Sequence, residues 1–273
     1  MYKMASMASE PMVTQETNEP INEQLKCLAE LYPHPRDKDI QFQEEGHIYT
    51  IRGDKYYKSC TTWVKSFFEK FNADAIVDKI MAGPNWATSK YFGKTREEIK
   101  AGWSENGKRA AEFGTAMHKH IEEFYNGIPL PESDLIEMEY FNRFQSDHSE
   151  LTPFRTEMMI YDEDIRICGS VDMLFLNEDN TLSIYDWKFA KEIQHHSYGK
   201  KALPPVHHLN DCNMIHYSLQ LNLYREILER KYGYVIRDMT LVFMHRDLSD
   251  SYVKMPVDRM DLTTLLAIRR TQI

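Results

Sequence analysis

The sequence has few cysteines and lacks any long apolar run. Its four cysteines are scattered, and none forms a Cys-x-x-Cys pair. This spacing favours free thiols in a reducing compartment over a disulfide framework or an iron–sulfur site. No segment reaches the roughly 18 apolar residues of a membrane-spanning helix, and the first residues lack the basic and then apolar pattern of a secretory signal. We therefore expect a soluble intracellular protein, in the cytoplasm, nucleus or mitochondrion.

Basic residues are outnumbered by acidic ones. The chain of 273 residues has 33 Lys and Arg against 42 Asp and Glu, which gives a formal net charge of −9. This balance argues against a simple basic coat for duplex DNA. It does not exclude a nuclease, because a local basic groove and a bound metal ion can act within an acidic whole.

The order of hydrophobic patterns predicts an α/β fold with a mixed central β-sheet flanked by helices, after a helical N-terminal extension. Residues 1–20 are expected to form a disordered tail, residues 21–106 a hairpin and helical region covering the core, and residues 107–273 the core. The elements predicted within the core are helices over 106–125, 132–148 and 214–232, and strands over 154–161, 165–176, 182–189, 239–245 and 251–257.

The N-terminal region carries several local signals. Segments 47–51 and 55–57 flank a Gly-Asp pair and predict a hairpin. Thr61 or Thr62 is expected to cap a short helix. Thr-Arg-Glu-Glu at 95–98 has the form of a capping box and predicts another helix start.

Two aspartates lie on neighbouring predicted strands. Asp172 and Asp186 are equidistant from Asp179 in the turn between those strands, so in a simple hairpin they would face each other. Opposed like charges are unfavourable in a sheet, and paired carboxylates call for a hard divalent cation such as Mg²⁺. Lys188 shares the face of Asp186, because strand side chains alternate. Beside the ion it would orient or deprotonate a water or stabilise phosphate charge, which indicates metal-assisted hydrolysis of a phosphate ester.

Further motifs occur in order with these residues. His118 ends a Gly-Thr-Ala-Met-His run on a predicted helix, Glu157 lies in the first core strand, and Gln220 and Tyr224 are four residues apart on the late helix. With the two aspartate motifs they resemble the series of the RecB-like branch of the PD-(D/E)XK nuclease superfamily. That series is Gly-x-x-x-His, a strand glutamate, Gly-x-x-Asp, Asp/Glu-x-Lys and Gln-x-x-x-Tyr. The resemblance covers roughly residues 107–245.

The resemblance implies a metal site and an activity. His118, Asp172 and Asp186 would bind Mg²⁺ or Mn²⁺. The backbone carbonyl of Phe189 would complete the site. Lys188 would position the attacking water and stabilise the transition state. The family commonly hydrolyses DNA phosphodiesters, and its compact members occur in viruses as well as in cells.

Other matching residues would support this site. Glu157 and Arg155 would line it or orient its members, with Glu157 counted among the catalytic residues. Gln220 and Tyr224 would contact the nucleic-acid backbone or brace the catalytic strand.

The resemblance extends more weakly to the N-terminal region. The segment 58–62 is similar to the part before the core in mitochondrial genome-maintenance exonucleases and related viral enzymes. Ser59 and Thr61 in this segment are expected to cover the groove and contact DNA. Lys191, in the loop after the last motif strand, is expected to add a local basic surface for phosphates.

The sequence departs from the family pattern at two positions. Val171 replaces the proline that names the superfamily, and Asp186 stands where glutamate is common. The C-terminal cysteine trio of the iron–sulfur branch is absent, so no iron–sulfur cluster is expected.

Several residues also have plainer interpretations. His118 could be an ordinary hydrogen-bonded histidine, Lys188 could form a structural salt bridge, and Gln220 and Tyr224 could simply pack between helix and sheet. A zinc site would have to come from a loop whose ligands lack the compact pairing of closed zinc sites. That loop contains His195, His196, His207, His208, Cys212 and His216.

The leading hypothesis is a metal-dependent deoxyribonuclease, an exonuclease acting on single-stranded DNA or DNA ends. Its rivals are a structure-specific endonuclease and a noncatalytic nucleic-acid-binding protein that keeps a nuclease fold.

Overall fold

The computed structural model of the chain describes residues 26–129, 135–197 and 199–273, and the tail predicted for residues 1–20 lies outside them. The helices in the described part are α1 (Leu28–Leu31), α2 (Cys60–Lys65), α3 (Ala73–Met81), α4 (Arg96–Tyr125), α5 (Ile136–Asp147), α6 (Asn213–Lys231) and α7 (Thr263–Arg270), with 3₁₀ turns η1 (Asp37–Asp39) and η2 (Trp86–Thr88). The strands are β1 (Ile40–Gln43), β2 (Ile48–Ile51), β3 (Lys58–Ser59), β4 (Thr152–Asp162), β5 (Ile167–Leu176), β6 (Leu182–Lys188), β7 (Ile236–Phe243) and β8 (Val253–Pro256).

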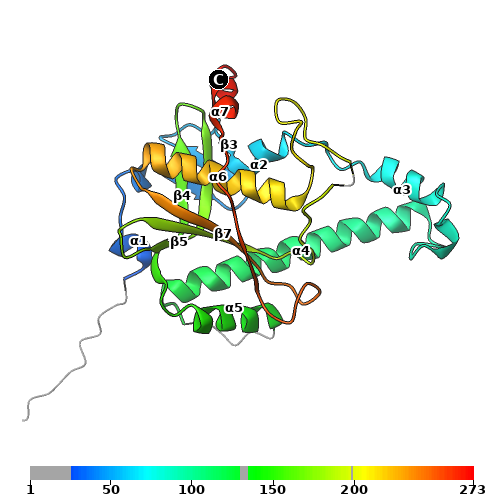
Figure 1. Ribbon diagram of the computed structural model, residues 1–273, viewed down its shortest axis with the longest axis horizontal. Coiled ribbons are helices and arrows are strands. Elements are labelled where there is room, and N and C mark those ends of the chain that lie inside the picture. Colours follow the sequence, from blue (N-terminus) through cyan, green and yellow to red (C-terminus); the bar gives the residue numbers. More distant parts are fainter. Residues whose placement is uncertain (1–25, 130–134, 198) are drawn as a thin grey trace, which may run out of the picture.

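Most of these strands form one mixed sheet, and β1 and β2 form a separate hairpin. The order in the large sheet is β3-β5-β6-β7-β8, with β4 on the other edge of β5. Strands β6 and β7 are parallel and joined through α6, whereas β5–β6 and β7–β8 are antiparallel. Helix α6 covers one face of the sheet, and α4 and α5 cover the other (Figure 1). The predicted α/β fold with a mixed sheet flanked by helices is confirmed.

Two apolar layers attach the helices to the sheet. On one face, Leu221 and Leu228 of α6 are fully buried. On the other, Met117 and Ile121 of α4 pack in the same cluster as Trp187 of β6. Burial of each such side chain contributes roughly 1.5–3 kcal/mol. The four-residue spacing of Met117 and Ile121 therefore anchors the C-terminal half of α4, close to where β5 and β6 meet.

Helix α4 is longer than its hydrophobic pattern predicts. Thr95 accepts a hydrogen bond from the Glu98 N–H, and the Glu98 side chain accepts one from the Thr95 N–H, which completes the predicted capping box. The helix then continues without a break, instead of starting anew at Asn106. Residues 104–113 are exposed on every face. No helix in the described ranges, α4 included, is both long and apolar enough to span a bilayer.

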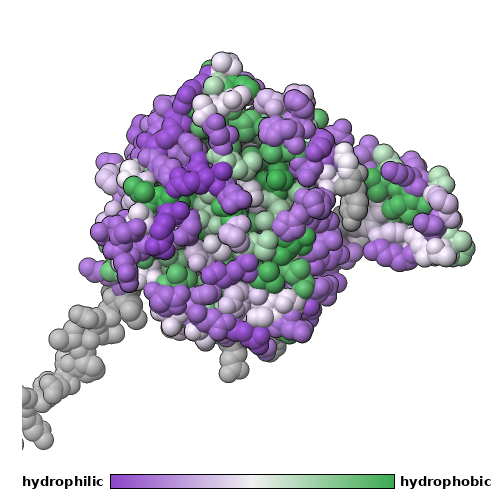
Figure 2. Space-filling model, in the orientation of Figure 1, coloured by the Kyte–Doolittle hydropathy of each residue, from purple (hydrophilic) through white to green (hydrophobic). Residues whose placement is uncertain are grey.

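The N-terminal half of α4 and helix α3 project from the body of the molecule (Figure 1). Asp74 of α3 lies 2.9 Å from Arg96 and 2.7 Å from Lys100 of α4, so ion pairs hold the two helices together. Figure 2 shows apolar side chains on the surface of this projection. Phe92, between α3 and α4, is 60% exposed.

The predicted hairpin is wrong in its pairing. Strand β2 pairs with β1, which precedes it, and not with segment 55–57. Beyond this pairing there is a single bridge, between Ile51 and Asp54, across a turn at Arg52 and Gly53. The rings of Phe42 and Tyr49 lie 4.7 Å apart across the observed hairpin, and such aromatic cross-strand pairs stabilise one register over another.

Two other N-terminal features differ from prediction. The cap of α2 is Ser59, whose Oγ accepts a hydrogen bond from the Thr62 N–H, and neither Thr61 nor Thr62. Ser59 also belongs to β3, a two-residue strand that pairs with the start of β5 in parallel. So short a strand carries no period that a sequence pattern can reveal.

Candidate metal centre

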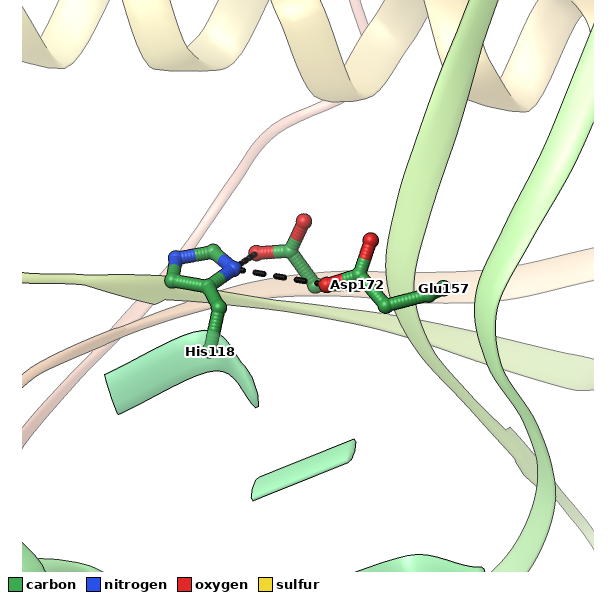
Figure 3. Close-up of side chains that lie close together, drawn as sticks. All are labelled: His118, Glu157 and Asp172. Atoms are coloured by element: carbon green, nitrogen blue, oxygen red, sulfur yellow. Dashed lines mark ion pairs between the residues drawn. The ribbon is translucent and has the colours of Figure 1, made fainter. Parts of the chain in front are cut away.

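Three side chains from three elements converge beside the sheet. His118 comes from α4, Glu157 from β4 and Asp172 from β5, and they point toward one another (Figure 3). One ligand atom of each lies within 4.8 Å of the other two. His118 Nδ1 is 3.5 Å from both Glu157 Oε1 and Asp172 Oδ2. Two ligands about 2.1 Å from one ion lie up to about 4.2 Å apart, so small side-chain movements would let all three hold one ion.

The backbone pairing between β5 and β6 stops just before Asp172. On one edge of β5, β3 pairs with the first two residues of the strand, and β6 pairs only from Met173 onward. Continued by one residue, the β5–β6 register sets Asp172 opposite Asp186, as the symmetric turn predicts. Asp172 Oδ2 accepts a hydrogen bond from the Trp187 N–H at 2.9 Å. The carboxylate therefore links the two strands where their backbone pairing stops.

Glu157 has a backbone conformation that is rare in a strand. Its φ is +45°, in the left-handed region that non-glycine residues seldom adopt. Such strained residues cluster at functional sites. Ser170 Oγ donates a hydrogen bond to Glu157 Oε2 at 2.8 Å, and Oε1 faces His118. The strand backbone and Ser170 together direct this carboxylate into the cluster.

The ring of His118 is oriented by a main-chain carbonyl. Its Nε2 lies 2.9 Å from the carbonyl oxygen of Trp187. A carbonyl oxygen only accepts, so Nε2 carries the proton in this contact. In the neutral ring the lone pair is then on Nδ1, which faces the two carboxylates. This is the tautomer that a metal ligand needs, fixed in the manner usual for metal-binding histidines.

The cluster is strongly coupled electrostatically. Burial alone would lower the pKa of His118, but the carboxylates of Asp172 and Glu157 outweigh it and raise that pKa to about 9. Burial and repulsion from Asp186 raise the pKa of Asp172 to about 7. Burial would raise the pKa of Glu157 as well, but the hydrogen bond from His118 outweighs it and lowers that pKa. Without metal the imidazolium is thus the cation between the carboxylates, a place that a metal ion can take.

Lys188 and Asp186 form a buried ion pair next to this cluster. Their side chains are 14% and 1% exposed. Lys188 Nζ also lies 4.9 Å from the centre of the Tyr217 ring on α6. Burial would lower the pKa of Lys188, but the charges of Asp186 and Asp172 outweigh it and raise the pKa. Lys188 therefore stays charged near neutral pH, which favours charge stabilisation over proton abstraction as its role.

Asp186, a predicted ligand, is not one of the three converging residues. Its Oδ2 faces Lys188. Its Oδ1 is buried and has no hydrogen-bond partner within the described ranges. A buried carboxylate oxygen without a partner is costly, so it suits a site that receives a cation.

Gln220 and Tyr224 pack against β5. Gln220 Nε2 donates a hydrogen bond to the Tyr224 hydroxyl at 2.8 Å. Tyr224 is 3% exposed, and a Cβ at Gly169 would lie 2.9 Å from its ring carbon Cε1. This close approach explains the glycine of the Gly-x-x-Asp motif. Of the two predicted roles for Tyr224, bracing the strand agrees with its burial.

Three further residues predicted for the site or its DNA contacts have structural roles in the fold. Arg155 is buried, and its Nη1 donates to the Tyr32 carbonyl and to Asp37 Oδ2, both at 2.9 Å. It ties the N-terminal segment to β4 and does not line the site, because a buried guanidinium requires such a carboxylate partner. Ser59 caps α2. Thr61 lies half-buried on the same helix.

Phe189 and Lys191 lie just beyond β6, beside a pocket of about 630 Å³. None of the three converging residues lines this pocket. Lys191 is exposed on its wall. The carbonyl in contact with the cluster is that of Trp187, two residues before the predicted Phe189.

The histidine-rich loop does not gather into a second metal cluster in the part of the chain that the structure describes. His216 Nε2 is 2.9 Å from Asp211 Oδ1, and its ring centre is 3.9 Å from that of Phe68. Cys212 is buried at the start of α6. These contacts account for His216 and Cys212 as parts of the fold.

Three contributors to the site were not predicted. Ser170 could have been found, because strand alternation places it on the face of Asp172 two residues later. Tyr217 also has a signal, since it precedes Gln220 by three residues on one helix face. The Trp187 carbonyl has none, because every residue carries a carbonyl.

Comparison with known proteins gives no name to this arrangement. No model of a known protein family matches the chain, and no curated protein matches it. The chain is similar to a solved structure described as "Crystal structure of SSO0001", with 15% sequence identity and a TM-score of 0.28. The match covers 51% of this chain and 57% of the other, so the chain spans little more than half of that protein.

Proposed function

We propose that the protein is a metal-dependent deoxyribonuclease that hydrolyses DNA phosphodiester bonds. The observation that carries this proposal is the convergence of His118, Glu157 and Asp172, with ligand atoms within 4.8 Å of one another. The Lys188–Asp186 pair beside them supplies a fixed positive charge. A nitrogen, two carboxylates and an adjacent lysine suit the hydrolysis of an anionic ester.

The donor set fits Mg²⁺ or Mn²⁺. Carboxylates suit both hard ions, and the imidazole of His118 makes Mn²⁺ the better match. Asp186 adds a further buried carboxylate oxygen without a hydrogen bond in the described part of the chain. When bound, the ion supplies an activated water and neutralises phosphate charge.

The chain's own residues have distinct roles in this proposal. The Trp187 carbonyl keeps His118 Nδ1 directed at the site, and Ser170 keeps Glu157 in place. Lys188 stabilises the negative charge that develops on the phosphate, because it remains protonated. The RecB-like resemblance supports DNA as the substrate and strand ends as the point of attack.

Cleavage assays on linear and circular DNA test this proposal. Wild-type protein should degrade end-labelled linear DNA with Mg²⁺ or Mn²⁺ and not with EDTA. Lys188→Ala should lower the rate by about 10²–10³, as for other lost charge-stabilising groups. Asp172→Asn keeps an acceptor for the Trp187 N–H but removes the charge, and it should also be inactive.

Two controls separate chemistry from charge and folding. Lys55→Ala and Glu178→Gln change exposed residues outside the site and should keep full activity. Near-ultraviolet circular dichroism checks that each variant is folded. Cutting of circular DNA would shift the proposal to an endonuclease. Binding of DNA by all variants with no metal-dependent cleavage by any protein would reject the enzyme and favour a binding module.

A further inference from the structure

A pocket of about 630 Å³ lies beside the candidate metal centre. Its walls come from the middle of α4, from the segment after β6 and from the segment after β7. The first of these walls includes Ala110, eight residues before His118 on the same helix. At a rise of about 1.5 Å per residue, that separation is roughly 12 Å along α4. Phe189, on the second wall, directly follows Lys188. The pocket therefore lies next to the metal centre, toward the N-terminal end of α4 from His118.

Aromatic rings line one side of the pocket. The Phe113 and Phe189 rings are 5.8 Å apart at an interplanar angle of 33°, and the Phe189 and His245 rings are 4.6 Å apart. Phe113 is 36% exposed, although it lies on the face of α4 that is buried further along. Exposed aromatic rings in an open pocket are well suited to stacking against a flat ligand such as a nucleobase.

Two cations beside these rings are not neutralised internally. Arg109 and Lys191 are exposed and form no ion pair with any residue in the described ranges. Arg246, the third basic residue of the wall, is 3.4 Å from Glu137, which is 2% exposed. Arg109 and Lys191 are therefore the groups left to contact phosphates.

The pocket is not uniformly basic. Glu192 and Asp247 also line it, so it lacks the continuous positive surface that tracks a long nucleic-acid backbone. A ligand with one flat ring and one or two phosphates fits this balance better than a duplex.

We propose that this pocket binds an unpaired nucleotide of single-stranded DNA, with its base stacked on Phe113 and its flanking phosphates near Arg109 and Lys191. The inference rests on the proposed nuclease function and adds the place where the substrate binds: a pocket for one base that is free to leave the stack. In a duplex each base face is covered by its neighbours, and exposing one costs unstacking energy. The pocket thus selects single strands or frayed ends.

Equilibrium binding without cleavage tests this inference. Fluorescence anisotropy in EDTA compares a short labelled oligothymidylate with an abasic strand of the same length. Phe113→Ala should weaken oligothymidylate binding about tenfold, which is the scale of losing one aromatic–base stack. It should leave abasic-strand binding unchanged. Phe113→Trp should retain the wild-type affinity.

Phe42→Ala is the matched control. Phe42 is 39% exposed, a fraction similar to the 36% of Phe113, but it lies on the β1–β2 hairpin and not in the pocket. The Phe42→Ala variant should bind the oligothymidylate and the abasic strand with wild-type affinity. Under Mn²⁺, Phe113→Ala should raise KM more than it lowers kcat, because stacking holds the substrate before and during reaction alike.

The outcomes also separate this inference from the proposed function. If wild type cleaves DNA but Phe113→Ala binds oligothymidylate as well as Phe42→Ala does, the pocket assignment is wrong and the nuclease proposal stands. An equal loss of affinity for both strands would likewise overturn it, since stacking needs a base. If wild type neither binds nor cleaves any DNA, the nuclease proposal and the inference both fail.

Discussion

At the scale of single residues, His118 and Asp172 of the metal-free cluster keep their protons to a higher pH than they would in the unfolded chain. The pKa of His118 is raised from 6.5 to about 9, so the stability it contributes is complete below pH 6.5 and lost as pH rises through 9. The pKa of Asp172 is raised from 3.8 to about 7, so its contribution is complete below pH 3.8 and lost as pH rises through 7. Both shifts act in the same direction.

We therefore expect the contribution of His118 and Asp172 to the unfolding free energy in EDTA to fall between about pH 4 and pH 9. Urea denaturation at a series of pH values measures it. In His118→Gln the fall between pH 6.5 and 9 should flatten relative to wild type. Identical pH profiles for the two proteins would mean that His118 is not held protonated by the carboxylates.

The two motif glycines should respond oppositely to alanine. A Cβ at Gly169 would lie 2.9 Å from the Tyr224 ring and 3.2 Å from Cys60 Sγ, whereas one at Gly114 would meet only Phe189 Cβ at 3.8 Å. Gly169→Ala should destabilise by about 1–3 kcal/mol through overpacking. Gly114→Ala, inside α4, should stabilise by up to about 1 kcal/mol. Thermal or urea unfolding compares them, and equal effects would refute the close approach at β5.

The site residues differ in how far their partners lie along the chain, and this decides which could be predicted. The register of β5 and β6 follows from the symmetric turn between them, so the sequence alone was sufficient to bring Asp172 and Asp186 near each other. Arg155 was mistaken for a site residue because its partners Tyr32 and Asp37 lie 123 and 118 residues away. Contacts over such separations depend on how the N-terminal segment folds across β4, which no local pattern encodes.

At the scale of elements, exposed ion pairs link the two helices of the projection formed by α3 and the start of α4. Asp74 contacts both Arg96 and Lys100, and Asp78 contacts Arg96. Exposed pairs are weak and screened by salt. Asp74→Ala should speed amide hydrogen exchange in α3 by about two- to fivefold, while α5 exchanges as before. High salt should speed wild-type exchange in the same helix, and unchanged α3 exchange in both experiments would show that apolar packing holds the projection.

Elements with strong local signals were predicted, and those fixed by distant contacts were not. The capping box at Thr95 marked the true start of α4. The hydrophobic pattern nevertheless began a separate helix at residue 106 and missed its continuity with the helix that starts after Thr95. The two meet in the stretch 104–113, which is exposed on all sides and so has no apolar face. The Gly-Asp turn after β2 suggested a hairpin with segment 55–57, yet β2 pairs with β1. A turn signal locates a reversal but does not choose the partner strand.

At the scale of the whole molecule, most of the buried or half-buried lysines and arginines in the described residues form ion pairs within the protein. Arg36 is 2.6 Å from Glu163, Lys231 is 2.9 Å from Asp164, and Arg155 is paired as described. With a net charge of −9, the protein should repel DNA over much of its surface and hold it mainly at the proposed site. Its affinity for single strands should therefore depend on salt through a small number of phosphates.

Replacing Arg109 and Lys191 by glutamine measures that number. Each phosphate contact on a single strand contributes a slope of about −0.7 to the plot of log affinity against log salt. The double variant should therefore reduce the slope by about 1.4, read from anisotropy titrations at several salt concentrations. Lys55→Ala should leave it unchanged. An unaltered slope in the double variant would place the DNA backbone elsewhere, whereas a loss of all salt dependence would mean that these two cations are the whole electrostatic footprint on an otherwise repulsive surface.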